Sequence, residues 1–192
     1  TANNALGFMI LEGENWINFS REEYNDFYGI SSFFDVKALA NNRIYLSSWG
    51  AGFYLVEKNN DSLDFYNYND TNSVINSTVP GTNYPVIGEF AQDPFGKAWF
   101  VQYGLKNPGY LIYSFDENKN MTGYNNHLSL NNRSYMKLAV DRNNTKWVGA
   151  HSEEGLYYFN EMGTPDNNSD DIYGKLTTSD NLISNQQTAL EI

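Results

Sequence analysis

The chain of 192 residues contains 41% apolar and 16% aromatic residues, no cysteine, and a formal net charge of −11. Its length and apolar content are sufficient for one globular domain with a buried core, and the absence of cysteine excludes disulfides and thiolate metal sites. The negative charge argues against nucleic-acid binding, and since no apolar stretch reaches the roughly 18 residues of a membrane span, direct membrane insertion is not expected.

The first predicted elements form an incomplete unit. Residues 1–4 show neither the basic nor the apolar part of a signal peptide. A Gly-led apolar strand is predicted over 7–11, a tight turn over 12–15 and an outer strand over 16–19. Trp16 on this outer strand is expected to pack at the edge of the unit.

Three complete units with one common layout follow. Each has an apolar strand, a polar Asn/Asp/Gly turn, an aromatic-centred strand, a loop ending in Gly, a hydrophobic-aromatic strand and an outer alternating strand. The predicted strands are 34–39, 44–46, 53–56 and 63–68 in the first unit, 86–91, 98–101, 110–113 and 121–124 in the second, and 136–140, 146–149, 156–159 and 171–176 in the third.

The repeat predicts the fold class. The central aromatics Tyr45, Trp99 and Trp147 lie about 50 residues apart, which is the spacing of propeller blades, and four strands make one blade. We therefore expect an all-β chain that is a β-propeller fragment of about three and a half four-stranded antiparallel blades. The whole chain, 1–192, is then one partial propeller domain with units at approximately 1–32 (partial), 33–80, 85–131, 135–185 and 188–192, the last being the first strand of a further unit.

The third unit carries a recognisable motif. An apolar strand is followed by Asp-Arg-Asn-Asn at 141–144, Lys-Trp-Val-Gly at 146–149 and Glu-Gly-Leu-Tyr-Tyr-Phe at 154–159. This pattern resembles the two-component-regulator propeller repeat, and 180–185 resembles the linker of that repeat. The match is good in the third unit, fair in the second, and degenerate in the first, where Tyr45 replaces Trp and Asn41 stands near the Asp position.

The resemblance implies a location and a kind of function. Such repeats occur in the periplasmic sensor regions of bacterial hybrid histidine kinases, especially in Bacteroidetes, and in surface proteins that include a component of the type IX secretion system. Similarity to them implies a periplasmic or extracellular, non-enzymatic module without a cofactor, which binds a carbohydrate or protein ligand in signal transduction. A secretion component with a protein partner and a propeller polysaccharide lyase or hydrolase remain as alternatives.

Candidate ligand-binding residues come from the loops between the second and third strands of each unit. These loops are expected on one face of the molecule, because repeats place equivalent loops together. Trp49 is a stacking candidate, held between Ser47-Ser48 and Gly50-Ala51-Gly52, whereas Trp99 and Trp147 sit at strand centres and are predicted to be core residues. The pooled candidates are Trp49, Tyr103, Lys106, His151, Glu153 and Glu154.

No pattern specifies a metal or a catalytic centre. His151 beside two glutamates lacks the three convergent ligands that a metal needs, and 116–120 and 141–144 lack the spacing of a calcium loop and are interpreted as turns. Neither a Gly-x-Ser-x-Gly elbow nor a phosphate loop is present. We expect no metal site and no enzyme activity, and we expect self-association through exposed blade edges, since repeats bury their faces by stacking.

Overall fold

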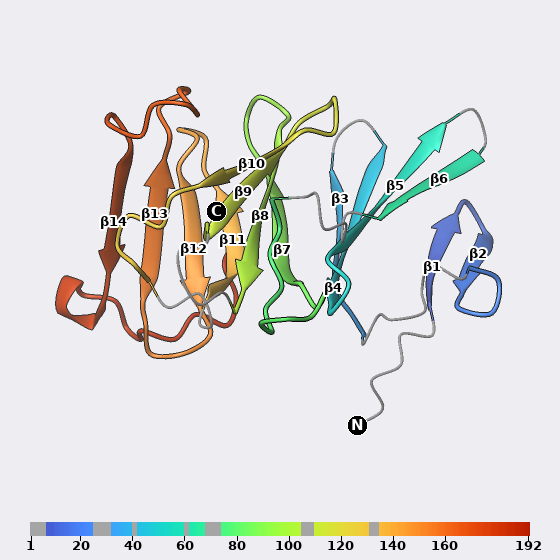
Figure 1. The fold of residues 1–192 in the computed structure, drawn as a ribbon, viewed down its shortest axis with the longest axis horizontal. Helices are drawn as coiled ribbons and strands as arrows, with labels where there is room; N and C mark the ends of the chain where they lie inside the picture. The colour runs from blue at the N-terminus through green and yellow to red at the C-terminus, as the bar shows by residue number, and fades with distance from the viewer. Residues whose placement is uncertain are drawn as a thin grey trace.

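A computed structural model describes residues 7–24, 32–39, 42–59, 62–67, 74–104, 110–130 and 135–192. The fold is all-β (Figure 1). Its strands are β1 (Gly7–Glu12), β2 (Asn15–Ser20), β3 (Ser32–Leu39), β4 (Arg43–Trp49), β5 (Phe53–Asn59), β6 (Ser62–Asn67), β7 (Val86–Gln92), β8 (Ala98–Tyr103), β9 (Ile112–Phe115), β10 (Met121–Tyr124), β11 (Tyr135–Val140), β12 (Lys146–Ala150), β13 (Leu156–Asn160) and β14 (Ile172–Leu176), with a short 3₁₀ turn, η2 (Thr178–Asp180). No helix in these ranges is long and apolar enough to cross a membrane.

The strands form three meandering antiparallel sheets and one hairpin. Blade I is β3-β4-β5-β6, blade II is β7-β8-β9-β10, blade III is β11-β12-β13-β14, and β1–β2 is a hairpin beside blade I. A single bridge between Trp49 and Val86 joins blades I and II. The inner strands β3, β7 and β11 contact one another in that order, so the blades are stacked as in a propeller. Figure 1 shows this order across the molecule, from β1–β2 to β14.

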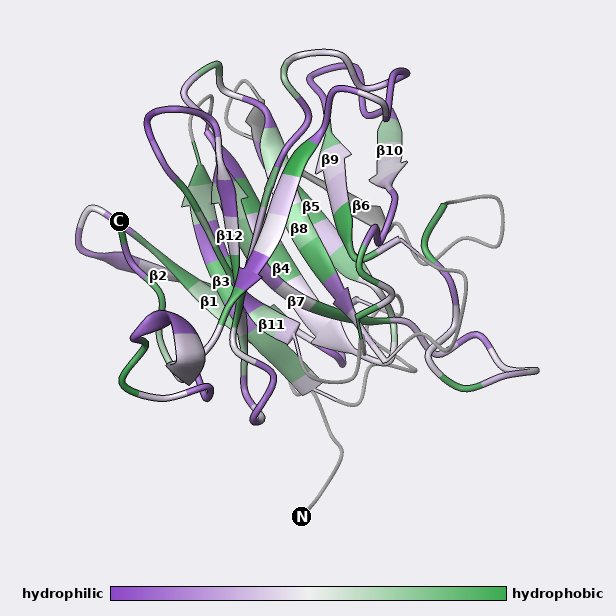
Figure 2. Ribbon diagram, turned by 90° about the vertical axis from the view of Figure 1, so that its left-hand side faces the viewer, coloured by the Kyte–Doolittle hydropathy of each residue, from purple (hydrophilic) through white to green (hydrophobic). Residues whose placement is uncertain are grey.

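Apolar residues fill the spaces between the sheets, as the repeat predicts. The largest cluster lies between blades II and III and contains Trp99, Tyr157 and Phe159, while Tyr45, Phe53, Phe90 and Phe100 belong to the cluster between blades I and II. Phe19 of β2 joins the third cluster with Leu46 and Tyr54 of blade I. In Figure 2, hydrophobic residues follow the strands and hydrophilic ones gather in the loops at their ends. The predicted all-β propeller architecture is thus confirmed.

Two aspartates explain the motif spacing found in the sequence. Asp93 accepts hydrogen bonds on Oδ1 from the backbone N–H groups of Phe95 and Lys97, each at 2.9 Å, and on Oδ2 from the indole of Trp99, also at 2.9 Å. Asp141 repeats the pattern: Oδ1 accepts from residues 143 and 145, and Oδ2 accepts from the indole of Trp147 at 3.0 Å. One carboxylate therefore closes the turn and also satisfies the tryptophan N–H that follows six residues later.

Blade I departs from this motif in two positions at once. Leu39 lies six residues before Tyr45, as Asp93 lies before Trp99, and Leu39 pairs with Arg43 across the turn. The position of the aspartate is therefore occupied by Leu39, two residues before Asn41, which lies outside the described residues. A tyrosine in place of tryptophan removes the indole N–H, so the carboxylate partner is not needed there.

The turns themselves use residues that tolerate a left-handed backbone. Asn42, Gly96, Lys119 and Asn144 have φ values of 56°, 92°, 68° and 65°, and each is the fourth residue of a tight hairpin connection. This arrangement matches a type I turn followed by a left-handed residue, for which Gly and Asn are favoured. The interpretation of 116–120 and 141–144 as turns agrees with this geometry.

Three other predictions have different outcomes. Trp99 is fully buried, as expected for core, whereas Trp147 is only half-buried, with its ring 5.6 Å from that of Tyr158. Trp16 is 61% exposed, so its predicted packing is wrong: its face of the β1–β2 hairpin points away from blade I. The strand predicted over 188–192 does not form, because a strand needs a ladder partner and the described residues supply none there.

Candidate functional site

Three rings from three successive blades lie together on one rim of the molecule. Trp49, Tyr103 and His151 each stand four residues after the central aromatic of their blade, where the second strand ends. The ring centroids of Trp49 and Tyr103 are 5.3 Å apart, and those of Tyr103 and His151 are 5.8 Å apart. Trp49 and Tyr103 are half-buried and His151 is exposed. We call these three residues the rim row.

The inner strand of blade I adds a further ring. Phe34 of β3 is 39% exposed, and its centroid lies 6.2 Å from that of Trp49. The surface around the rim row therefore presents aromatic faces next to polar loops. Such a surface suits ligands that offer C–H or cationic groups to an aromatic ring and hydroxyl groups to its polar surroundings.

The remaining candidates have less defined positions. Glu153 is exposed, and Glu154 is half-buried, with Oε2 at 4.0 Å from Nζ of Lys175. Both lie in the loop that begins with His151, so they add negative charge at one end of the rim row. Lys106 lies outside the described residues. A ligand-binding role for each of the six candidates stays a prediction.

Linkers between blades hold the rim loops in place. The backbone N–H groups of Gly50 and Gly52 donate to the carbonyl of Pro85 at 3.0 and 3.2 Å, and the ring of Tyr84 covers Gly50. Gly50 has φ of 115°, and a Cβ there would lie 2.4 Å from the Tyr84 ring, so only glycine fits. In blade III the N–H of Gly155 donates to the carbonyl of residue 185 at 2.8 Å in the same way. Sequence reasoning treated these linkers only as connections.

Charged side chains occupy one equivalent position on the three inner strands. Asp35 and Lys137 follow a register irregularity in β3 and β11, and Glu89 lies within the irregularity of β7; such bulges re-aim side chains. Lys137 Nζ lies 2.5 Å from Glu89 Oε1, and Glu89 Oε2 accepts the N–H of Leu138 at 3.1 Å. Burial first and the charge of Glu89 second raise the pKa of Asp35. The sequence signal that would have located Asp35, Glu89 and Lys137 is that each occupies the same position in its repeat.

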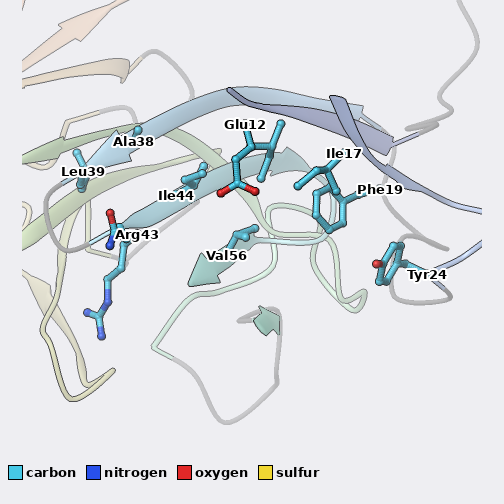
Figure 3. A pocket seen from close by; sticks show the side chains of 11 residues that line it. Glu12, Ile17, Phe19, Tyr24, Ala38, Leu39, Arg43, Ile44 and Val56 are labelled. Carbon is cyan, nitrogen blue, oxygen red and sulfur yellow. The ribbon is translucent and has the colours of Figure 1, made fainter. Parts of the chain in front are cut away.

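An apolar groove lies between the β1–β2 hairpin and blade I (Figure 3). Its volume is about 480 Å³, and apolar residues such as Ile10, Ile17 and Ile44 line it. Val36 on the neighbouring inner strand is 62% exposed, whereas its counterparts Phe90 and Leu138 in blades II and III are 1% and 4% exposed. Val36, beside the groove, thus lies on a part of the blade face that the described residues leave uncovered.

The charged groups of the groove serve the structure. Arg43 Nε lies 2.7 Å from Oε1 of Glu57, and its Nη2 donates to the carbonyl of Glu117 in blade II at 2.9 Å. Lys119 Nζ lies 2.9 Å from the other oxygen of Glu57. These bonds link blades I and II on the rim opposite the rim row. In the described ranges, no three His, Cys, Asp or Glu side chains cluster as metal ligands would.

Solved structures with this fold include a bacterial surface component, an extracellular domain and a lyase. PorZ, an essential bacterial surface component of the type-IX secretion system of Porphyromonas gingivalis, matches with a TM-score of 0.71 and 20% identity over 88% of this chain and 23% of its own. The extracellular domain of a protein described as a one-component system of B. thetaiotaomicron matches with a TM-score of 0.60 and 15% identity over 97% and 22%. Virginiamycin B lyase from Staphylococcus aureus matches with a TM-score of 0.55 and 10% identity over 92% and 50%.

These likenesses define the class of fold. No protein-family model and no curated protein matches this chain. At 20% identity or less, the solved structures show a shared propeller fold, and two of the three are a surface component and an extracellular domain of bacterial proteins. The chain spans less than a quarter of the length of the first two structures and half of the third.

Proposed function

We propose that the chain is a non-catalytic binding module of an exported bacterial protein, which recognises a glycan or protein ligand in the periplasm or at the cell surface. Its role would be that of a sensor region in a two-component system. The observation that carries the proposal is the rim row, in which three consecutive blades place a ring at the same repeat position, with centroids 5.3 and 5.8 Å apart. The fold likeness to extracellular and surface domains supports the location.

The chemistry of the rim favours recognition of a polar ligand with flat apolar faces. Sugar rings expose C–H groups that pack against aromatic rings, and their hydroxyl groups bond to polar neighbours. Trp49 and Tyr103 provide the aromatic faces, and His151, Glu153 and Glu154 provide the polar groups. Because the rings belong to different blades, the site is extended and suits an oligomeric ligand.

A glycan-array screen tests this proposal. Wild-type chain is compared with Trp49→Ala and with Trp16→Ala, which removes an exposed tryptophan outside the rim row. Retention of an oligosaccharide by wild type and Trp16→Ala but not by Trp49→Ala would support the glycan function. Equal retention by both variants would refute a role for the rim row. A silent array directs the search to a protein partner, captured from envelope extracts with the same pair of variants.

Two alternatives differ in partner or chemistry. A protein-binding component of a type IX secretion or surface machinery is favoured by the fold likeness to PorZ, and its ligand would be another protein. A propeller lyase or hydrolase is suggested by the fold likeness to virginiamycin B lyase, but it needs acid and base groups that converge on a substrate. Release of unsaturated or reducing sugar ends from polysaccharides incubated with the chain would establish the enzyme.

A further inference from the structure

The linker between blades I and II joins two members of the rim row through one side chain. Thr78 Oγ1 donates to the backbone carbonyl of Tyr103 in blade II at 2.8 Å. The same oxygen accepts the N–H of Val86, which forms the bridge to Trp49 of blade I, at 3.2 Å. One hydroxyl therefore uses both its donor and its acceptor capacity at the ends of β7 and β8, on the residue Val86 that pairs with both Tyr103 and Trp49.

The surrounding linker fixes this hydroxyl. The N–H of Thr78 donates to the carbonyl of Tyr84 at 3.0 Å, which closes the linker into a compact loop. Tyr84 in turn packs on Gly50, the residue after Trp49. Residue 76 bonds through its backbone N–H to Gln102 Oε1 at 3.2 Å, one position before Tyr103. Thr78 thus sits where both rim loops and the linker meet.

Other side chains of the linker do not make this connection. Thr82 Oγ1 donates to the carbonyl of Val79 at 2.8 Å and lies 3.1 Å from Ser77 Oγ, so its bonds stay inside the linker. In blade III, the carbonyl of His151 accepts from Gln186 Nε2 at 2.8 Å, a contact at an exposed surface. Thr78 therefore differs from its neighbours in bonding, through one half-buried hydroxyl, both to Tyr103 and to Val86, the residue of blade II that bridges to Trp49.

We infer that Thr78 is a positioning residue for ligand recognition, and that its hydroxyl sets the spacing between the rings of Trp49 and Tyr103. The inference rests on the proposed function, because the ring spacing matters only if the rim row contacts a ligand. The effect of the hydroxyl on the spacing of the rings can be tested without a ligand. Loss of the hydroxyl leaves the Tyr103 carbonyl and the Val86 N–H without these bonds, so Val86, which pairs with both Trp49 and Tyr103, is held less firmly at the rim.

The test is a set of matched variants examined by NMR. Thr78→Val replaces the hydroxyl by a methyl group of nearly the same size, Thr78→Ser keeps the hydroxyl, and Thr82→Val makes the same chemical change within the linker only. We expect the cross-relaxation between the Trp49 and Tyr103 rings to fall at least twofold in Thr78→Val and to stay at the wild-type level in the other two. Should Thr78→Val not fold, Thr78→Ala removes the hydroxyl and gives the same comparison.

The outcomes separate the inference from the proposed function. Unchanged ring contacts in folded Thr78→Val overturn the inference, whatever the array shows. Lost ring contacts together with a lost oligosaccharide signal support both proposals. Lost ring contacts with an unchanged oligosaccharide signal would show that Thr78 positions the rings and that the rim row is not the binding site, which overturns the functional role of Thr78.

Discussion

A buried ion pair between blades II and III provides the sharpest stability prediction. Lys146 is fully buried, its Nζ is 3.8 Å from the centroid of the Trp99 ring, and it pairs with the carboxylate of Glu161, whose side chain is 4% exposed. Asn144 Nδ2 donates to the other carboxylate oxygen at 3.1 Å. Burial lowers the pKa of Lys146, and Glu161 opposes this change by favouring the charged form.

Glu161→Ala should destabilise the chain strongly, since it leaves a buried ammonium group without its counter-ion. Breaking one side of a buried pair costs about 3–5 kcal/mol. For a domain of this size each kcal/mol lowers the melting temperature by about 2–4 °C, so the expected fall is roughly 6–20 °C. Chemical denaturation followed by fluorescence gives the free energy of unfolding directly.

Two further variants test the reasoning. Glu154→Ala removes a carboxylate whose 4.0 Å contact with Lys175 is one-third exposed, and it should cost less than about 1 kcal/mol. The double variant Lys146→Met with Glu161→Leu removes both charges and should recover most of the loss, because the desolvation cost of both ions disappears. A loss in Glu161→Ala no larger than that in Glu154→Ala, or a double variant less stable than Glu161→Ala, would contradict a stabilising role of the buried pair.

Three other predictions concern buried phenols and the exposed blade face. The free energy of unfolding, measured in urea titrations, should fall as the pH rises above about 10. Burial raises the pKa of Tyr124 to about 12 and also raises the pKa of Tyr157, so only the unfolded chain ionises readily. Each such tyrosine lowers the free energy of unfolding by at most about 1.4 kcal/mol per pH unit. Tyr157→Phe should be neutral or stabilising, because the buried hydroxyl of Tyr157 makes no hydrogen bond within the described structure. Tyr113→Phe loses a hydrogen bond of 2.9 Å to a buried side-chain oxygen and should cost about 1 kcal/mol or more in the same denaturation assay. Self-association in sedimentation experiments should weaken in Val36→Asp, on the uncovered blade face, and persist in Phe95→Asp, which changes a still more exposed apolar residue on a turn; equal behaviour of the two would contradict this use of the face.

The sequence was sufficient to predict the blades because each repeat contains the residues that determine its turn and its strand pairing. Asp141 and Trp147 are six residues apart, and that spacing follows from one carboxylate that bonds both the turn and the indole. In blade I the carboxylate is missing: the hairpin register assigns its place to Leu39, two residues before Asn41. A repeat position is reliable only when both partners of the interaction are present.

Packing between blades was harder to predict than the blades themselves. Trp16 and Trp99 both sit on predicted strands, yet one is 61% exposed and the other fully buried, because only Trp99 has a neighbouring blade on its side. The candidate site shows the same limit. Equivalent loop positions placed Trp49, Tyr103 and His151 on one rim, but Thr78 lies in a linker, outside the strands and turns whose spacing was compared between the repeats, so that spacing could not mark it.

The interface between blades also determines which part of the rim row depends on the buried pair. β12 begins with Lys146 and leads directly to His151, so it connects the pair to one end of the row. Tyr103 and His151 belong to blades II and III, whereas Trp49 and Tyr103 belong to blades I and II. We therefore expect folded Glu161→Ala to reduce the cross-relaxation between the Tyr103 and His151 rings and to leave that between Trp49 and Tyr103 unchanged. A change in both contacts, or in neither, would show that the spacing between two neighbouring rings of the rim row is not determined by the interface between their own two blades.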